Sequence, residues 1–153
     1  DLAIDACVRA GLPLTVCGDG PLAAELRARA AGADVVFPGR VGEVELAALR
    51  AAASVALVPS RAHETFGLAA LEAMAAGVPV VATRVGALAE LEGDVTLVAP
   101  EDVAELAGAA RAVAEDADAG AAALAAAHRR AAPAVIAPRL AALYDDVARR
   151  HGA

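Results

Sequence analysis

The stretch from Ser54 to Thr83, SVALVPSRAHETFGLAALEAMAAGVPVVAT, decides the fold. It opens as a short apolar strand pattern, continues as a helix rich in Ala and Leu, and closes as a second apolar strand pattern. Two strands joined by one helix form a βαβ unit, in which the strands are parallel and the crossover is right-handed. The stretch therefore predicts a parallel sheet with helices packed on it.

The same alternation continues on both sides of this stretch, and from Glu101 onward the pattern is purely helical, interrupted at Pro133 and Pro138. Strand patterns occupy residues 12–18, 34–39, 54–60, 78–83 and 94–100, and helix patterns occupy residues 2–10, 22–31, 43–52 and 66–76, with a short helical piece near 87–91. We predict an α/β fold: a Rossmann-like parallel sheet with helices on both faces, in three layers, and a helical C-terminal end. At 153 residues the chain is the size of one domain.

Composition excludes several classes of function. The formal charge of −7 argues against a nucleic-acid surface or an anionic-membrane patch, because both need a basic field. The two cysteines have no zinc-type or C-x-x-C spacing, and no apolar run reaches the roughly 18–20 residues of a membrane span. We expect a soluble, cytosolic protein without a transmembrane segment, in which any anionic ligand is held locally.

The helix start at "HETFGL" predicts an anion site. In an open parallel sheet, ligands bind at the carboxyl ends of the strands beside helix N-termini. If Thr65 caps the helix, the N–H groups of Phe66, Gly67 and Leu68 stay free in its first turn, where the helix dipole favours an anion. Gly67 has no Cβ, so a phosphate oxygen can approach closely. The alternative is that Thr65 only caps the helix and Gly67 only relieves packing.

Two carboxylates flank this helix start. Glu64 precedes the helix and Glu72 follows eight residues later, so they lie about two helical turns, roughly 12 Å, apart. A ligand that touches both is extended, and a phosphate, a sugar near Glu64 and a ribose near Glu72 fit that span because carboxylates accept hydrogen bonds from diols. A glycosidase places its two carboxyls roughly 5–9.5 Å apart, so the larger separation of Glu64 and Glu72 argues against a glycosidase. The alternatives are a solvated loop charge for Glu64 and an exposed helix edge for Glu72.

The segment "CGDGPLA" formally matches the dinucleotide fingerprint G-x-G-x-x-A at Gly18, Gly20 and Ala23. That fingerprint requires an acid at the end of the next strand, where this chain has Phe-Pro-Gly-Arg, and Pro21 removes one of the N–H groups that would cradle a pyrophosphate. Both departures disfavour the nicotinamide- or flavin-binding interpretation, and the alternatives to it are a purely structural tight turn and a turn beside a nucleotide bound in another way.

Taken together, "VCGDGPLAAEL", "FPGRV", "ALVPSRAHETFGLAALEAMAAGVPVVAT" and "VGALAEL" resemble the C-terminal, donor-binding domain of the group 1 retaining glycosyltransferases of the GT-B fold. The resemblance covers about residues 1–115 and extends more loosely to the final helix. The resemblance implies that Glu64 is the catalytic residue and contacts hydroxyls of the donor sugar, and that Glu72 contacts the ribose. It further implies that the amides of Phe66, Gly67 and Leu68, after Thr65, bind the distal phosphate, that Arg40 and Val41 lie against the base, and that Gly18 and Gly20 border the nucleotide.

By this resemblance the partner is a UDP-, GDP- or ADP-linked sugar, and no cofactor or obligatory metal is expected. Family members begin this domain with a strand and a loop whose Arg and Lys grip the diphosphate, and this chain starts after them. We therefore expect residues 1–153 to be the donor-binding domain alone, without its first strand and the N-terminal acceptor domain, and inactive in isolation. The alternatives are a nucleotide-sugar epimerase of related fold and a non-catalytic α/β binding module.

Overall fold

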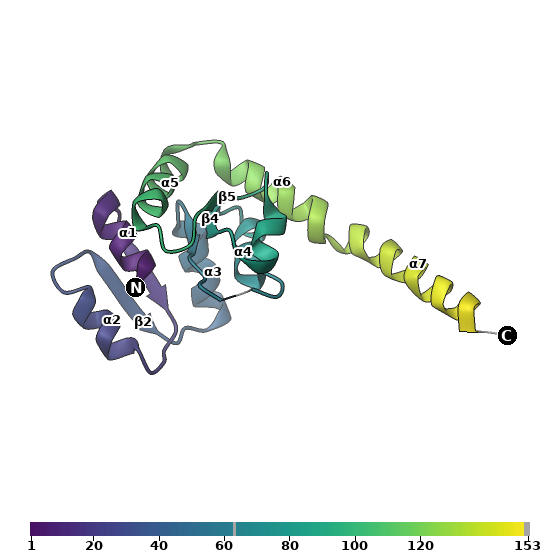
Figure 1. Ribbon diagram of the computed structural model, residues 1–153, viewed down its shortest axis with the longest axis horizontal. Helices are drawn as coiled ribbons and strands as arrows, with labels where there is room; N and C mark the ends of the chain where they lie inside the picture. The colour runs from purple at the N-terminus through teal and green to yellow at the C-terminus, as the bar shows by residue number, and fades with distance from the viewer. Residues whose placement is uncertain (63, 152–153) are drawn as a thin grey trace.

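The structure is a computed structural model that describes residues 1–62 and 64–151. Strands and helices alternate up to the last strand, as the sequence predicts, and the C-terminal part is helical (Figure 1). The strands are β1 (Leu14–Cys17), β2 (Val35–Gly39), β3 (Ala56–Val58), β4 (Val80–Thr83) and β5 (Thr96–Val98). The helices are α1 (Leu2–Ala10), α2 (Ala23–Arg29), α3 (Glu43–Ala52), α4 (Leu68–Ala75), α5 (Val103–Glu115), α6 (Ala119–Ala131), α7 (Pro133–His151) and the 3₁₀ helix η1 (Gly86–Leu91).

All strand pairs are parallel, but they form two sheets rather than one. β1 pairs with β2, and separately β3, β4 and β5 pair in that order. In the larger sheet Leu57 is opposite Val81, and Ala82 is opposite Leu97. No pairing joins β1 to β3 within the described residues. The parallel α/β fold is confirmed, whereas the single continuous sheet that the sequence predicted is divided between β1 and β3.

The core lies on the two faces of the larger sheet. All four residues of β4 are buried, and because side chains alternate along a strand they supply both faces. Val81 packs in a cluster with residues of α1 and α5, whereas Val80 and Ala82 pack in a second cluster with residues of α4 and α6. The prediction of three layers is confirmed for this sheet. Alanines fill much of both clusters, so the helices approach the sheet closely.

The smaller sheet is less well covered. Neither α2 nor α3, whose residues are all described, contains a buried residue, and Val36 in β2 is 56% exposed. Polar contacts at the surface hold this region instead: the Arg29 guanidinium donates to Asp5 of α1 at 2.7 Å, and Arg27 lies over the Phe37 ring at 4.9 Å. The hydrophobic contribution to stability therefore comes chiefly from the larger sheet.

The junction between η1 and β5 is fixed to α6 by Asp94. Its carboxylate accepts hydrogen bonds from Arg129, at 3.0 Å, and from Arg130. The hydrogen bond from Arg130, with that from Arg129, holds the pKa of Asp94 below its usual range. Asp94 therefore remains ionised at neutral pH and joins the helical layer to the end of η1.

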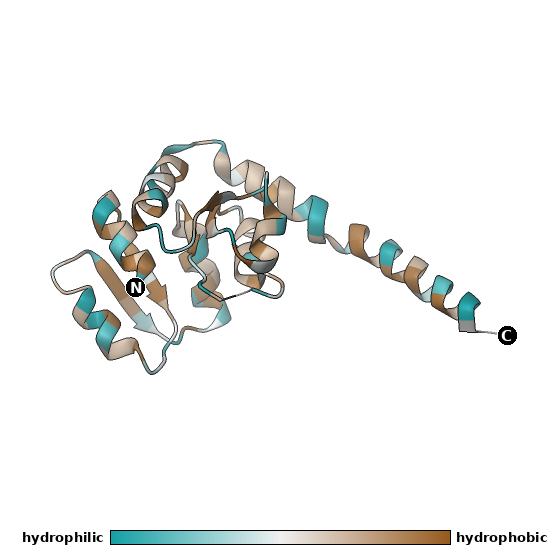
Figure 2. Ribbon diagram, viewed as in Figure 1, coloured by the Kyte–Doolittle hydropathy of each residue, from teal (hydrophilic) through white to brown (hydrophobic). Residues whose placement is uncertain are grey.

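The last helix, α7, points away from the rest of the molecule (Figures 1 and 2). Pro138 lies inside α7, so the prediction that it interrupts the helical pattern is wrong. Brown and teal alternate along α7 in Figure 2, and its larger apolar side chains are 42–65% exposed: Ile136, Leu140, Leu143, Tyr144 and Val147. An apolar stripe of this spacing occupies one side of a helix.

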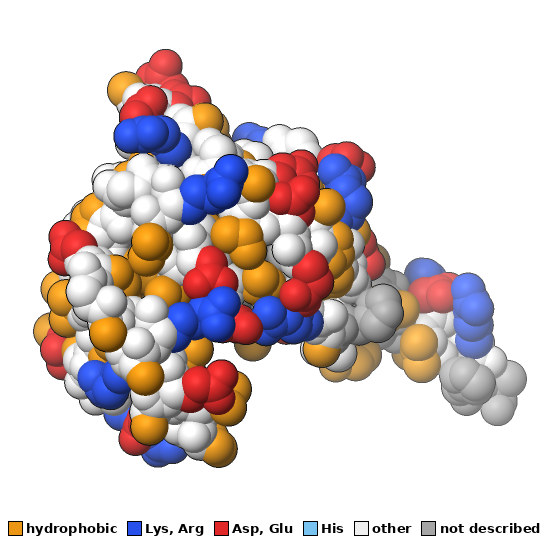
Figure 3. Space-filling view, turned by 60° about the vertical axis from the view of Figure 1, so that its left-hand side comes forward, with side chains coloured by type: hydrophobic (Ala, Val, Ile, Leu, Met, Phe, Trp, Pro, Cys, Tyr) orange, Lys and Arg blue, Asp and Glu red, His pale blue; other side chains and the backbone are white. Residues whose placement is uncertain are grey.

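Over the part of the chain that the structure describes, no helix is both long and apolar enough to cross a bilayer. The face shown in Figure 3 carries acidic and basic side chains intermixed rather than a basic patch. The cytosolic location indicated by the sequence stays a prediction.

The difference between the buried core and α7 yields a stability prediction. Leu106 of α5 is 2% exposed and Leu143 of α7 is 58% exposed. We expect Leu106→Ala to lower the free energy of unfolding by about 2–5 kcal/mol, because it removes buried methyl groups and leaves a cavity. The matched variant Leu143→Ala is expected to change it by less than about 0.5 kcal/mol. Urea unfolding of the 153-residue chain measures both, and equal losses would contradict this description of the core.

Candidate functional site

The candidate site lies at the carboxyl edge of the larger sheet. β3 ends at Val58 and is followed by the loop that contains Glu64, and β4 ends at Thr83 and is followed by a short loop and η1, which begins at Gly86. The strands are parallel, so these loops emerge at the same edge. Two hydrogen bonds connect them: Thr83 Oγ1 donates to the Ser60 carbonyl at 2.6 Å, and the Ala87 N–H donates to the Glu64 carbonyl at 2.8 Å.

The start of α4 differs from the prediction. α4 begins at Leu68, and its N-cap is Gly67 without a side-chain cap, so Thr65 does not cap the helix. Gly67 has φ +79°, a left-handed conformation that favours glycine, and a Cβ there would lie 3.1 Å from Leu88 Cδ2. The backbone conformation thus requires a glycine at position 67, independently of any role in ligand binding. The first-turn amides belong to Leu68, Ala69 and Ala70, two residues later than predicted.

These amides are available to a ligand. Among residues 1–62 and 64–151, no acceptor receives a hydrogen bond from the N–H groups of Leu68 or Ala69, as expected for the first turn of a helix. Leu68 and Phe66 are each 60% exposed, whereas Gly67 is buried. The helix start is therefore open to solvent, with unused donors and the positive end of the helix dipole.

Glu64 is half-buried beside this helix start. Its backbone carbonyl is held by Ala87, and Ser60 Oγ lies 3.4 Å from Glu64 Oε2 as a hydrogen-bond donor. In the structure Ser60 connects Thr83, at the end of β4, to the Glu64 carboxylate.

Glu72 lies on the exposed side of α4, and its side chain is 53% exposed. The opposite side of the helix, with Ala70, Ala73 and Met74, is buried. Arg50 of α3 donates a hydrogen bond to Glu72 Oε2. The hydrogen-bonding partner of this carboxylate is therefore Arg50, which sequence reasoning did not identify.

The other predicted residues lie at the ends of β1 and β2. The Gly18 N–H donates to the Gly39 carbonyl at 2.7 Å, and the Gly20 N–H donates to Asp19 Oδ1 at 2.9 Å. The turn at Gly18–Gly20 and Arg40 are exposed, and Val41 is half-buried. No hydrogen bond or ion pair within the described ranges joins these residues to segment 64–68. They stay predictions for the nucleotide end of the site.

Sequence reasoning also missed the contacts of Arg61, which lies in the same loop as Glu64. Its guanidinium donates to both carboxylate oxygens of Asp1, at 2.7 and 2.9 Å, and to Glu101 Oε1 at 2.5 Å. The only sequence signal was an arginine directly after Pro59-Ser60. Arg61 ties the loop to the start of α1 and to the segment that precedes α5.

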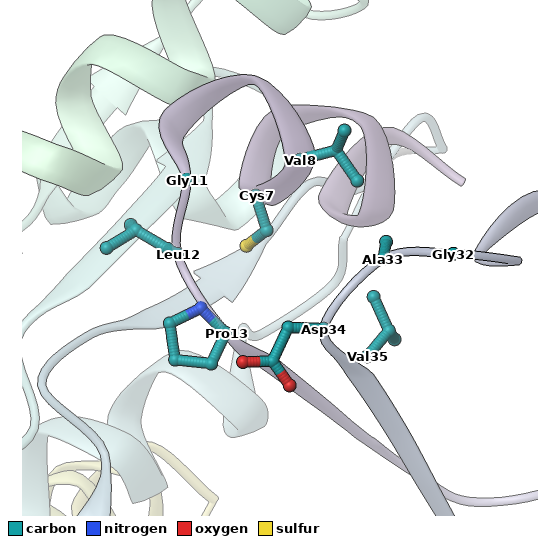
Figure 4. Close-up of a pocket in the computed structure, with 9 residues that line it drawn as sticks. All are labelled: Cys7, Val8, Gly11, Leu12, Pro13, Gly32, Ala33, Asp34 and Val35. Carbon is teal, nitrogen blue, oxygen red and sulfur yellow. The ribbon is translucent and has the colours of Figure 1, made fainter.

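A surface pocket of about 320 Å³ lies elsewhere, where the strands β1 and β2 begin (Figure 4). Cys7 and Asp34 point toward it from α1 and from the residue before β2. Burial raises the pKa of the Cys7 thiol, which keeps this cysteine protonated at neutral pH. Because the pocket is at the opposite end of the strands from the glutamates, it is not the candidate site. The described side chains include no cluster of three or more His, Cys, Asp or Glu able to hold a metal ion.

Residues 3–116 match the family described as Glycosyl transferases group 1. The chain belongs to this family. It is 47% identical over 79 residues to a GDP-mannose-dependent alpha-(1-6)-phosphatidylinositol dimannoside mannosyltransferase of Mycobacterium tuberculosis, a match that covers 51% of this chain and 20% of the relative.

Solved structures agree with the fold. Anabaena HepE in complex with UDP superposes with a TM-score of 0.84 at 26% identity, over 95% of this chain and 44% of that one, and HepE has also been solved with UDP-glucose. The C-terminal domain of a group 1 glycosyltransferase from Francisella tularensis, at 22% identity and a TM-score of 0.72, covers 84% of this chain and 77% of that domain, and shows the fold alone. The structural neighbours are GT-B glycosyltransferases. The chain thus spans a fifth of the mannosyltransferase and under half of HepE.

The Arg50–Glu72 pair predicts how much Glu72 contributes to folding. Both side chains are partly exposed, and exposed pairs contribute little because water screens them. We expect Arg50→Ala and Glu72→Gln each to lower the free energy of unfolding by about 0.2–1 kcal/mol in urea titrations. A loss above about 2 kcal/mol in either variant would contradict this and make Glu72 a structural residue.

Proposed function

We propose that residues 1–153 form the donor-binding domain of a retaining glycosyltransferase, which moves a sugar from a nucleoside diphosphate sugar to an acceptor. The observation on which the proposal depends is the arrangement at one sheet edge: the open start of α4, with Glu64 held beside it by Ala87 and Ser60. Donors for an anion lie next to an acceptor for hydroxyl groups. A sugar phosphate presents both.

The diphosphate would bind at the start of α4. The chain has a net charge of −7, so attraction for an anion has to be local, and a helix N-terminus provides it. The amides of Leu68 and Ala69 would donate to the distal phosphate, with those of Phe66 and Gly67 beside them. As the sugar leaves, these donors would stabilise the charge that develops on the departing diphosphate.

The two glutamates would have separate tasks. Glu64 would accept hydrogen bonds from hydroxyls of the donor sugar and orient its reacting carbon toward the acceptor. Glu72 would accept from the ribose, exchanging its hydrogen bond from Arg50 for one from the ligand. Arg40 and Val41, which follow β2, would lie against the base, and the turn at Gly18–Gly20, which follows the parallel strand β1, would border the nucleotide.

The base and sugar are open to three choices. HepE binds UDP and UDP-glucose in its structures, whereas the mycobacterial relative is named as GDP-mannose-dependent. UDP, GDP and ADP donors are therefore all candidates here.

We further propose that this domain needs two additions. The first is an extended segment preceding Asp1, which would lie between β1 and β3 and join the two sheets. The second is another domain, which would close the cleft and bind the acceptor. The division of the sheets and the under-half coverage of HepE support this arrangement. With one wall of the site only, the isolated chain would transfer no sugar, because closure excludes water and aligns the acceptor.

The separate tasks of the glutamates predict different mutants. In the intact enzyme Glu72→Gln should weaken a nucleoside diphosphate and its sugar conjugate alike, since both contain the ribose. A hydrogen bond to a charged group contributes about 1.5–3 kcal/mol, or roughly ten- to a hundredfold in affinity. Glu64→Gln should leave the diphosphate unaffected and weaken the sugar nucleotide and turnover. Calorimetry with UDP, UDP-glucose, GDP and GDP-mannose measures both.

The controls distinguish the competing functions. Glu90→Gln changes an exposed glutamate of η1 and should alter neither affinity. Equal losses for both ligands in both site variants would mean that the glutamates only support the fold. Turnover of a sugar nucleotide without any acceptor would indicate an epimerase, and no stabilisation by any nucleotide would indicate a non-catalytic module.

A further inference from the structure

Gly86, the first residue of η1, lies directly against the backbone of Glu64. It has φ +49°, and a Cβ at this position would lie 2.4 Å from the Glu64 carbonyl oxygen and 2.7 Å from its nitrogen. Both are backbone atoms, so no side-chain rotation can relieve the overlap. Only glycine fits here without moving the segment that contains Glu64.

The contact is also a hydrogen bond. The next residue, Ala87, donates its N–H to the Glu64 carbonyl at 2.8 Å. Four residues before it, Thr83 Oγ1 donates to the Ser60 carbonyl at 2.6 Å, and Ser60 Oγ lies 3.4 Å from the Glu64 carboxylate. The segment 83–87 therefore holds Glu64 at two points. Ala87 binds the Glu64 backbone directly, and Thr83 acts on the Glu64 carboxylate through Ser60.

The same short helix supports the other end of the site loop. Leu88 and Leu91 of η1 are 0% and 4% exposed, and they lie 3.1 and 3.9 Å from the position of a Cβ on Gly67. The far end of η1 is itself fixed, because the Asp94 N–H donates to the Leu91 carbonyl at 2.9 Å and the Asp94 carboxylate is paired with Arg129 and Arg130. η1 thus contacts both residue 64 and residue 67 from one anchored position.

We propose that Gly86 is a positioning residue: by letting η1 lie on the Glu64 backbone, it fixes the Glu64 carboxylate relative to the start of α4. Through this contact Gly86 sets the affinity for the sugar part of a sugar nucleotide rather than for its diphosphate. The second statement rests on the proposed function, whereas the first concerns only this chain.

The test compares Gly86→Ala with Gly93→Ala. Gly93 also has a positive φ, +84°, but a Cβ there would meet nothing within 4 Å. Both substitutions impose backbone strain on alanine, and only Gly86→Ala adds an overlap with Glu64. Any difference between the two variants therefore reports the contact and not the loss of a glycine.

The first measurement is amide hydrogen exchange, resolved by residue, on the chain without ligand. Gly86→Ala should speed exchange of the Ala87 N–H by about tenfold or more relative to Gly93→Ala, because its hydrogen bond to Glu64 is lost. Equal exchange of Ala87 in the two variants would overturn the positioning role, whether or not the protein binds a nucleotide.

The second measurement is calorimetry on the intact enzyme with UDP, UDP-glucose, GDP and GDP-mannose. Gly86→Ala should weaken the sugar nucleotide by about tenfold and change the matching diphosphate by less than about twofold, whereas Gly93→Ala should change neither. Equal weakening of both ligands would overturn the sugar-specific role. Failure of the unsubstituted protein to bind any of the four, and ADP and ADP-glucose as well, would contradict the proposed function, and the exchange result would still decide the positioning role.

A further pair of variants covers the case in which Gly86→Ala does not fold. Thr83→Val removes the hydroxyl that bonds the Ser60 carbonyl at nearly constant volume, and Thr83→Ser retains it. Thr83→Val should speed exchange of the Ala87 N–H, which bonds the Glu64 carbonyl, and weaken the sugar nucleotide selectively, and Thr83→Ser should restore both. If Thr83→Val leaves exchange and both affinities unchanged, segment 83–87 does not position Glu64.

Discussion

The structure depends on β4, a strand of four residues that is buried on both faces. Val81 packs toward α1 and α5, and Val80 and Ala82 pack toward α4 and α6. Buried small and branched residues fix the strand by close packing, since displacing it would open voids on both sides. The chain leaves β4 at Thr83, which bonds the loop after β3, and then forms η1 beneath Glu64 and Gly67. The position of the site therefore follows from the packing of one strand.

Local charge explains how an acidic chain can attract a diphosphate. Arginines near the site are already engaged: Arg50 with Glu72, Arg61 with Asp1 and Glu101, and Arg84 with Glu92. They hold elements together and neutralise neighbouring carboxylates. The attraction proposed for the start of α4 would come instead from backbone amides and the helix dipole. The net charge of the surface would oppose it only by long-range repulsion, which salt screens.

Sequence reasoning predicted the elements well and the contacts between loops poorly. The strands and helices follow from apolar periodicity, and Gly11, a residue type that commonly ends helices, ends α1 in the left-handed conformation. The helix start was misplaced because Thr65 is a residue type that commonly caps helices, whereas the N-cap is Gly67 in the left-handed conformation. Arg50 and Gly86 were missed because they reach Glu72 and Glu64 across 22 residues of sequence in both cases. Local patterns do not record such tertiary contacts.

Chemical-shift mapping on the backbone amides of this chain tests the central claim most directly. The chain is titrated with UDP, GDP and ADP, and each amide is followed by ¹⁵N–¹H correlation spectra. If the start of α4 binds the diphosphate, the largest shifts for at least one nucleotide fall on Gly67, Leu68 and Ala69, with a second set at residues 18–20 and 40–41. Largest shifts around Cys7 and Asp34, or no shifts with any of the three nucleotides, would contradict it.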